Sequence, residues 1–171
     1  MGQIGSIQLC DSRAKEIKKR LAERCTTKHL MKKYKLLDHT ADVRVEVWGK
    51  TRKELFANAV AAMFDVMIDI ADDEKTKSAE VKTVKIAGND LEDTLINFLR
   101  EALYLFNGQG WQVRCCEPLE ITGRSIIARL QGEPYNRQKN PLKAEIKAVT
   151  YHGLNIKKSK NGWQAKVVFD V

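Results

Sequence analysis

The sequence predicts an α+β domain in which two helices pack on a mixed or antiparallel sheet. Val43, Val45 and Val47 recur at every second position, the period of a strand with one buried face. Two later segments, residues 55–67 and 91–106, repeat apolar side chains at helical spacing. Further strand patterns occupy residues 81–86, 111–121, 124–131, 143–150 and 163–170. Elements that each have one apolar face bury it most simply when helices pack on a sheet.

Local signals predict where these elements begin and end. Thr51 and Glu54 form a capping box, which satisfies free backbone amides at the start of the first helix. Gly88-Asn89-Asp90 opens the second helix, and Gly108 ends it. Asn161-Gly162 predicts a hairpin turn between the last two strands, because both residues tolerate a positive φ.

The positive charge of the chain is concentrated at its N-terminus. The net charge is +8, but residues 1–35 alone hold ten basic and three acidic side chains, or +7, which leaves about +1 on the rest. We therefore predict a basic extension at residues 1–33, either helical or disordered, and one domain at residues 34–171. The extension is either a basic helix that lies on RNA or an acidic partner, or a solvated segment upstream of a natural start near Met31.

No segment predicts a membrane span or a secretory signal. The longest apolar stretch, residues 57–70, is interrupted by Asn58, Asp65 and Asp69, and a spanning helix needs about 20 apolar residues. No apolar run of signal-peptide length follows the basic N-terminal residues. We expect a cytoplasmic protein without membrane partners, or a nuclear location in a eukaryote.

Two acidic features stand out at the ends of predicted strands. Asp38, His39 and Asp42 lie within five residues, directly before the valine-rich strand. Asp170 follows the apolar run of the last strand, and Val171 carries the terminal carboxylate. If the first and last strands pair, Asp42 and Asp170 approach each other and provide oxygen ligands for a divalent cation.

The alternative for these residues is purely structural. An Asp before a strand is commonly a turn former or a cap. An Asp next to the end of a chain is commonly just exposed. Spacing alone therefore leaves both interpretations open.

Other catalytic chemistries have little support in the sequence. It contains neither a Gly-x-Gly-x-x-Gly motif nor a phosphate-binding Walker loop. The chain has three histidines, but no Ser or Cys stands in a nucleophile-elbow context.

Several separated motifs, in the right order, resemble the archease family over about residues 33–171. The opening signature is the segment YKLLDHTADV at 34–43, and the segment NAVAAMF follows at 58–64. GEP at 132–134, EIKAVTYHG at 145–153 and the ending VVFDV at 167–171 complete the resemblance. The first 30 or so residues depart from the family pattern, so nothing carries over to them.

The resemblance implies an archease-like fold, with a strand-helix-strand-strand module, and an accessory protein without turnover of its own. Archeases act with the RtcB-type RNA ligase, which joins spliced tRNA halves with GTP and a divalent metal ion. They promote guanylylation of the ligase and its multiple turnover. The family's acidic metal-site residues correspond to Asp42 and Asp170, with Asp38 and His39 in the same signature and Lys147 at a nearby basic position. The identity of the metal ion, whether Ca²⁺, Mg²⁺ or Mn²⁺, stays open.

Two rival functions remain. A metal-dependent phosphoesterase would use Asp38, Asp42 and Asp170, and it predicts turnover of phosphoesters by the isolated protein. An RNA-binding or chaperone-like modulator of RNA-processing proteins would use the basic N-terminus, and it predicts salt-sensitive RNA binding.

Overall fold

The computed structural model describes residues 34–37, 42–69 and 80–171 of the chain. The elements in chain order are β1 (Tyr34–Leu37), β2 (Asp42–Gly49), α2 (Arg52–Met67), β3 (Glu80–Ala87), α3 (Leu91–Asn107), β4 (Trp111–Ile121), β5 (Ser125–Pro134), β6 (Ala148–Ser159) and β7 (Gly162–Asp170). The predicted extension at 1–33 lies outside the described residues, so its helical or disordered form stays a prediction.

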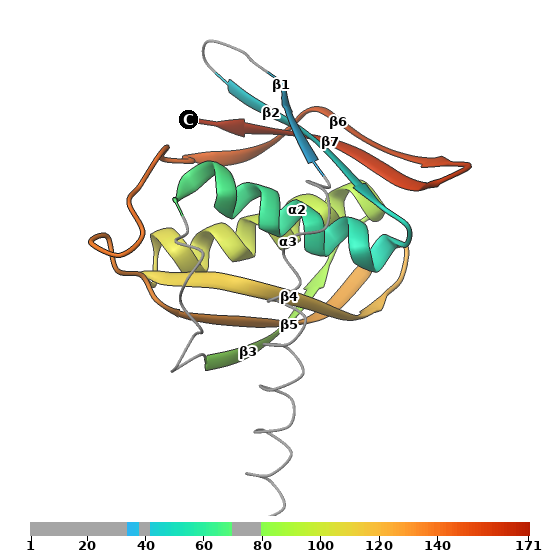
Figure 1. The fold of residues 1–171 in the computed structure, drawn as a ribbon. Helices are drawn as coiled ribbons and strands as arrows, with labels where there is room; N and C mark the ends of the chain where they lie inside the picture. Colours follow the sequence, from blue (N-terminus) through green and yellow to red (C-terminus); the bar gives the residue numbers. More distant parts are fainter. Residues whose placement is uncertain (1–33, 38–41, 70–79) are drawn as a thin grey trace, which may run out of the picture.

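The strands form two antiparallel sheets with the helices between them. One sheet has the order β1-β2-β7-β6 and the other β3-β5-β4. Figure 1 shows α2 and α3 as the middle layer, with one sheet above and the other below. The predicted α+β class is confirmed. The prediction of one sheet was too simple, and every strand pair in the described residues is antiparallel rather than mixed.

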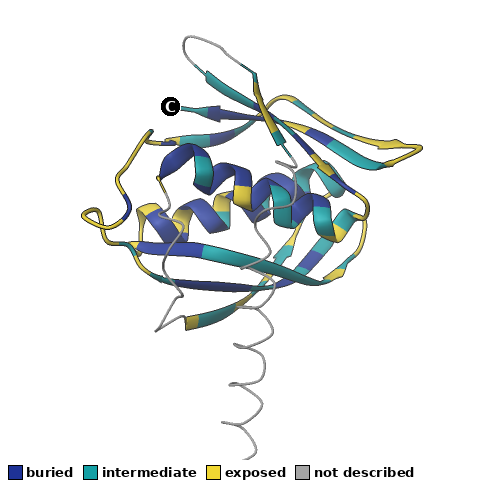
Figure 2. Ribbon diagram, viewed as in Figure 1, coloured by how far each residue is buried: buried dark blue, intermediate teal, exposed yellow. Residues whose placement is uncertain are grey.

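The helices supply most of the core because each contacts both sheets. α2 lies against β2 and β4, and α3 lies against β6 and β4. Figure 2 shows the buried residues gathered on the helices and on the sheet faces toward them. The largest side chains of the helices are almost fully buried, among them Leu55, Phe56, Met63, Phe64, Leu95, Phe98 and Leu99.

The predicted helix caps are confirmed. The Thr51 Oγ1 accepts a hydrogen bond from the Glu54 backbone amide at 3.1 Å, and the Glu54 carboxylate accepts one from the Lys50 amide at 2.9 Å. The Asp90 carboxylate accepts from the Asp93 amide at 2.7 Å in the same way. Both helices therefore begin where their sequences predict.

The hairpin between β6 and β7 is also present, but one residue earlier than predicted. Ser159 pairs with Gly162, so Lys160 and Asn161 occupy the turn and Gly162 begins β7 with a φ of 130°. A Cβ at Gly162 would lie 2.4 Å from the Gly49 carbonyl oxygen. Glycine is needed here for its backbone and for this close approach.

The strand predicted at 143–150 is mostly wrong, because β6 spans Ala148–Ser159. The amides of Lys143 and Ala144 both donate to the carbonyl oxygen of Met67, at 2.8 and 3.3 Å. Their backbone therefore satisfies the last turn of α2 rather than a sheet. β1 was not predicted, since four residues are too few for a clear alternation. In the described part of the chain, no helix is long and apolar enough to cross a membrane.

Candidate functional site

Asp42 and Asp170 lie directly opposite each other at one end of the four-stranded sheet. Asp42 is the first residue of β2 and Asp170 the last of β7, and the two are Cα partners in the antiparallel pair. Opposite residues in such a pair have Cβ atoms about 4.5–5.5 Å apart. The predicted approach of these two residues through pairing of their strands is confirmed.

The apolar residues of both strands set this register. Val45 and Val47 of β2, with Val167 and Phe169 of β7, are buried against the helices. A slip of one residue would move all of these side chains to the outer face of the sheet, so the register is strongly specified. The two aspartates consequently share the outer face.

Among the residues that the structure describes, the two carboxylates have no basic partner. Both residues are half-buried, and within the described residues neither side chain forms a hydrogen bond or an ion pair. Like charges directly opposite each other destabilise a strand pair. A cation or a proton shared between the carboxylates would remove this repulsion.

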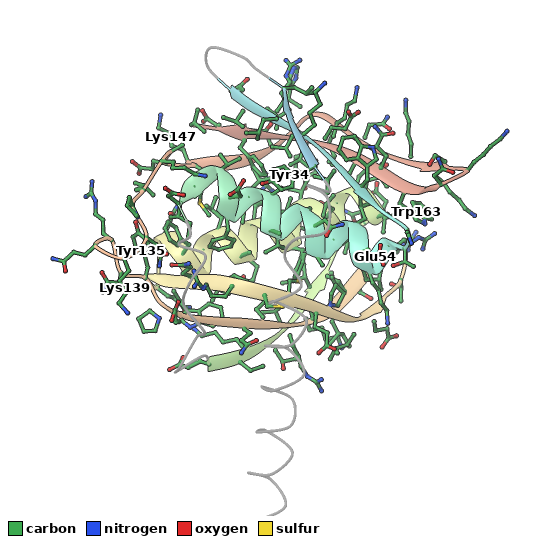
Figure 3. The ribbon with its side chains drawn as sticks, viewed as in Figure 1. Tyr34, Glu54, Tyr135, Lys139, Lys147 and Trp163 are labelled. Carbon is green, nitrogen blue, oxygen red and sulfur yellow. The ribbon has the colours of Figure 1, made fainter. Side chains whose placement is uncertain are left out.

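Lys147 and Val171 lie at the same end of the sheet. The Lys147 amide donates to the Asp170 carbonyl oxygen at 2.8 Å, and its ammonium donates to the Val171 backbone oxygen at 3.1 Å. Figure 3 shows Lys147 beside the end of β7. The structure thus brings Asp42, Asp170, Val171 and Lys147 together.

Asp38 and His39 lie outside the described residues, so their supporting roles stay predictions. Among the described residues no group of three or more His, Cys, Asp or Glu side chains surrounds one point. The described donors are therefore the two carboxylates and a backbone oxygen. All are oxygens, which suits a hard cation such as Mg²⁺, Mn²⁺ or Ca²⁺ better than zinc. Mg²⁺ commonly binds one or two carboxylates and completes its shell with water and substrate phosphates, so the donor set fits such an ion.

A second polar cluster, Asp93, Arg100 and Tyr151, joins α3 to β6. The Tyr151 hydroxyl donates to the Asp93 carboxylate, and this hydrogen bond is the main reason that the pKa of Asp93 is below its ordinary value. The Arg100 guanidinium carbon lies 4.9 Å from the Tyr151 ring centre, and its Nε and an Nη donate to the Val149 carbonyl oxygen. These groups satisfy one another, which indicates a structural connection.

Sequence reasoning missed the basic residues beside the aspartate pair. Arg44 and Lys166 lie on the same outer face, at alternate positions along β2 and β7. Arg44 is two residues from Asp42 and Lys166 is four from Asp170. This even spacing was a usable signal, since side chains an even number of residues apart on a strand share a face.

The comparisons with known proteins agree on one family. A family model described as the archease protein family matches residues 34–171. Protein archease of Methanosarcina acetivorans is 42% identical over 144 residues, which are 82% of this chain and 97% of that protein. Protein archease-like of Drosophila melanogaster is 36% identical over 129 residues, which are 72% of this chain and 80% of that protein.

This chain belongs to the archease family. The solution structure of Methanobacterium thermoautotrophicum protein 1598 has a TM-score of 0.65 and 26% identity, and it covers 82% of this chain and 100% of its own. A crystal structure of an archease from Thermotoga maritima, described as a possible chaperone, has a TM-score of 0.52 and 24% identity, covering 84% and 98%. The latter likeness shows the fold alone. Family membership supports an accessory protein that works with a protein partner in tRNA processing.

Proposed function

We propose that this archease activates an RtcB-type tRNA-splicing RNA ligase by promoting its guanylylation and multiple turnover. The observation that carries the proposal is the pairing of Asp42 with Asp170 at one end of the sheet. Two half-buried acids without a basic partner among the described residues are hard to explain by stability, because their repulsion opposes folding. Family membership supplies the accessory role. In this proposal tRNA and GTP bind to the ligase and are only indirect partners of this chain.

In this proposal Asp42 and Asp170 hold a divalent cation, Ca²⁺, Mg²⁺ or Mn²⁺, with the Val171 oxygen beside them. Such an ion, when bound, stabilises the negative charge of nucleotide phosphates. Lys147 holds the end of β7 through its two hydrogen bonds to Asp170 and Val171. Asp38 and His39 are proposed to support the same site from the segment before β2.

The location of the acid pair explains how an accessory protein would use it. The pair lies where β2 begins and β7 ends, at the rim of the domain near the C-terminus (Figure 1). A rim site can reach into a partner's active site. The isolated domain then has no turnover, since the remaining catalytic groups belong to the ligase. Action on a tRNA-splicing ligase implies a cytoplasmic or, in a eukaryote, a nuclear location.

Substitution of the acid pair tests this function. We expect Asp42→Ala and Asp170→Ala each to reduce stimulation of ligase guanylylation by at least about 10–100-fold, since that is the usual loss when only a group that supports a metal ligand is removed. Glu80→Ala is the matched control, because Glu80 is an exposed acid at the start of β3 in the other sheet. Full stimulation by both Asp variants would exclude the proposal.

One observation favours a second candidate, an RNA-binding or chaperone-like modulator. Residues 1–35 carry +7, which suits contacts with RNA phosphates. Deletion of residues 1–33 separates the two functions. The ligase-activator proposal expects activation to survive the deletion, whereas the RNA-binding alternative expects it to fall and RNA affinity to lose its salt dependence. Metal-dependent hydrolysis of a phosphoester by the isolated chain would instead support the phosphoesterase.

A further inference from the structure

A bulge in β6 folds over the outer face of the four-stranded sheet. Thr150 pairs with Val168 and Asn155 with Lys166, so β6 advances five residues where β7 advances two. The extra residues include Gly153, whose φ of 69° is a left-handed conformation. Val168 is only 3% exposed although it lies on the outer face, and a Cβ at Gly153 would be 3.7 Å from its Cγ2. The bulge therefore covers Val168.

A small pocket of about 150 Å³ lies between this bulge and β2. Its side chains include three basic residues from three different strands: Arg44 of β2, His152 of β6 and Lys166 of β7. Leu37 and Val168 complete an apolar wall, and none of the described residues that line the pocket is an acid. Pockets for drug-sized molecules measure about 300–1,000 Å³, so this one has room for a single small group.

The Arg44 guanidinium has a hydrogen-bond donor that no described residue uses. Its Nε is shielded from solvent without a hydrogen-bond partner, and within the described residues no acid pairs with the side chain. A donor that is shielded from solvent and forms no hydrogen bond lowers the stability of the fold. Glu46 neutralises Lys166 only weakly, because the two charged groups are 3.9 Å apart and the Lys166 side chain is 59% exposed. The pocket thus has an excess of positive charge.

We propose that this pocket, formed by Arg44, His152 and Lys166, binds a phosphate group. A guanidinium matches phosphate oxygens with parallel hydrogen bonds, and an ammonium adds a point charge. The pocket holds one phosphate, and the rest of a phosphate ester lies outside. The site does not require the metal ion or the ligase of the proposed function. Arg44 is two residues from Asp42 on the same face, about 7 Å along the strand, so an oligophosphate can span both sites.

Phosphate binding is measured by titrating inorganic phosphate into the metal-free full chain and following backbone amide NMR signals at constant ionic strength. We expect the largest shifts at Arg44, in the β6 bulge and at Lys166. Arg44→Gln and Lys166→Gln should each weaken binding on the order of tenfold, as expected for one charged hydrogen bond. Lys158→Gln is the matched control, since Lys158 is an exposed base of β6 outside the pocket.

Titrations with guanosine and with GMP distinguish a phosphate group on a nucleotide from a free phosphate anion. Shifts in the pocket with GMP and not with guanosine support recognition of the phosphate group on a nucleotide, and equal affinity for inorganic phosphate supports a free anion. Lys166 is exposed, so its variant tests the pocket even if Arg44→Gln perturbs folding. Shifts spread evenly over all basic residues, or unchanged affinity of Lys166→Gln, would overturn the proposal.

The test of phosphate binding and the test of ligase activation can fail independently. Asp42→Asn and Asp170→Asn should retain phosphate binding without metal, because neither residue lines the pocket. Loss of ligase activation in these variants with intact phosphate binding supports both proposals. Absence of phosphate binding by the wild-type chain removes the pocket proposal alone.

Discussion

At the scale of single residues, the meaning of a side chain depends on which neighbour the strand pairing brings to it. Asp42 and Asp170 are separated by almost the whole domain in sequence and are direct neighbours in the sheet. Arg44 is two residues from Asp42 on the same face and lines the basic pocket. A carboxylate pair and a basic pocket thus lie side by side on one outer face, which suits a ligand with both a cation and phosphate groups.

Tyr34 shows how one residue connects an edge strand to a helix. Its hydroxyl donates to the Asp65 carboxylate of α2. Burial, followed by this hydrogen bond and the negative charge of Asp65, raises the pKa of Tyr34 well above its ordinary value of about 10. The folded protein therefore retains the phenolic proton at a pH where the unfolded chain loses it.

This shift predicts a pH-dependent difference between the wild type and Tyr34→Phe. A raised pKa contributes stability that is complete below about pH 10, the unfolded value, and is lost as the pH rises toward the folded value. We expect the wild type to exceed Tyr34→Phe in free energy of unfolding by a constant amount up to about pH 10, and by less above it. Chemical denaturation between pH 8 and 11 measures this. Parallel profiles across the whole range would contradict it.

At the scale of elements, the helices are set by local signals and the strands by their partners. Capping residues at Thr51 and Asp90 start the two helices where the sequence predicts them. β6 does not follow its local pattern, because Lys143 and Ala144 bond to the end of α2. A backbone amide pairs with whichever acceptor the tertiary structure supplies, and a strand pattern does not identify that acceptor.

The cap of α2 gives a prediction at this scale. Thr51→Ala removes the hydrogen bond from the Glu54 amide, and the usual cost of losing such a cap is about 1 kcal/mol. Urea denaturation should show this loss with an unchanged dependence on denaturant. Thr83→Ala is the control, because Thr83 is exposed on β3 and such surface changes stay within about 0.5 kcal/mol. Equal stability of both variants would show that the cap is unimportant.

At the scale of the whole molecule, two sheets enclose one helical layer. This arrangement buries the helices from both sides (Figure 2). Phe98 of α3 lies at the centre of the layer, fully buried, with its ring 6.1 Å from that of Phe56 of α2. The layer is therefore shared by the whole domain rather than divided between two cores.

A cavity at Phe98 should consequently destabilise the entire domain. We expect Phe98→Ala to lower the free energy of unfolding by about 3–5 kcal/mol, the cost typical of large-to-small core substitutions. Tyr104→Ala removes an aromatic ring from the same helix at a position that is 57% exposed, and it should change stability little. Thermal unfolding followed by circular dichroism and by tryptophan fluorescence should give one shared transition. Two separate transitions would indicate independent sheets.

The sequence by itself determined the α+β class and the bounds of both helices, and it predicted the approach of Asp42 to Asp170 on the condition that the first and last strands pair. Helical periodicity and caps are local, and the valine alternation of β2 allows one register against the equally apolar β7. Only the tertiary structure decided that there are two sheets, that β6 begins at Ala148, and that its bulge forms a basic pocket with Arg44 and Lys166. Those features depend on which strands pair and which backbone groups compete for them. Such contacts join residues far apart in the chain, and no local pattern specifies them.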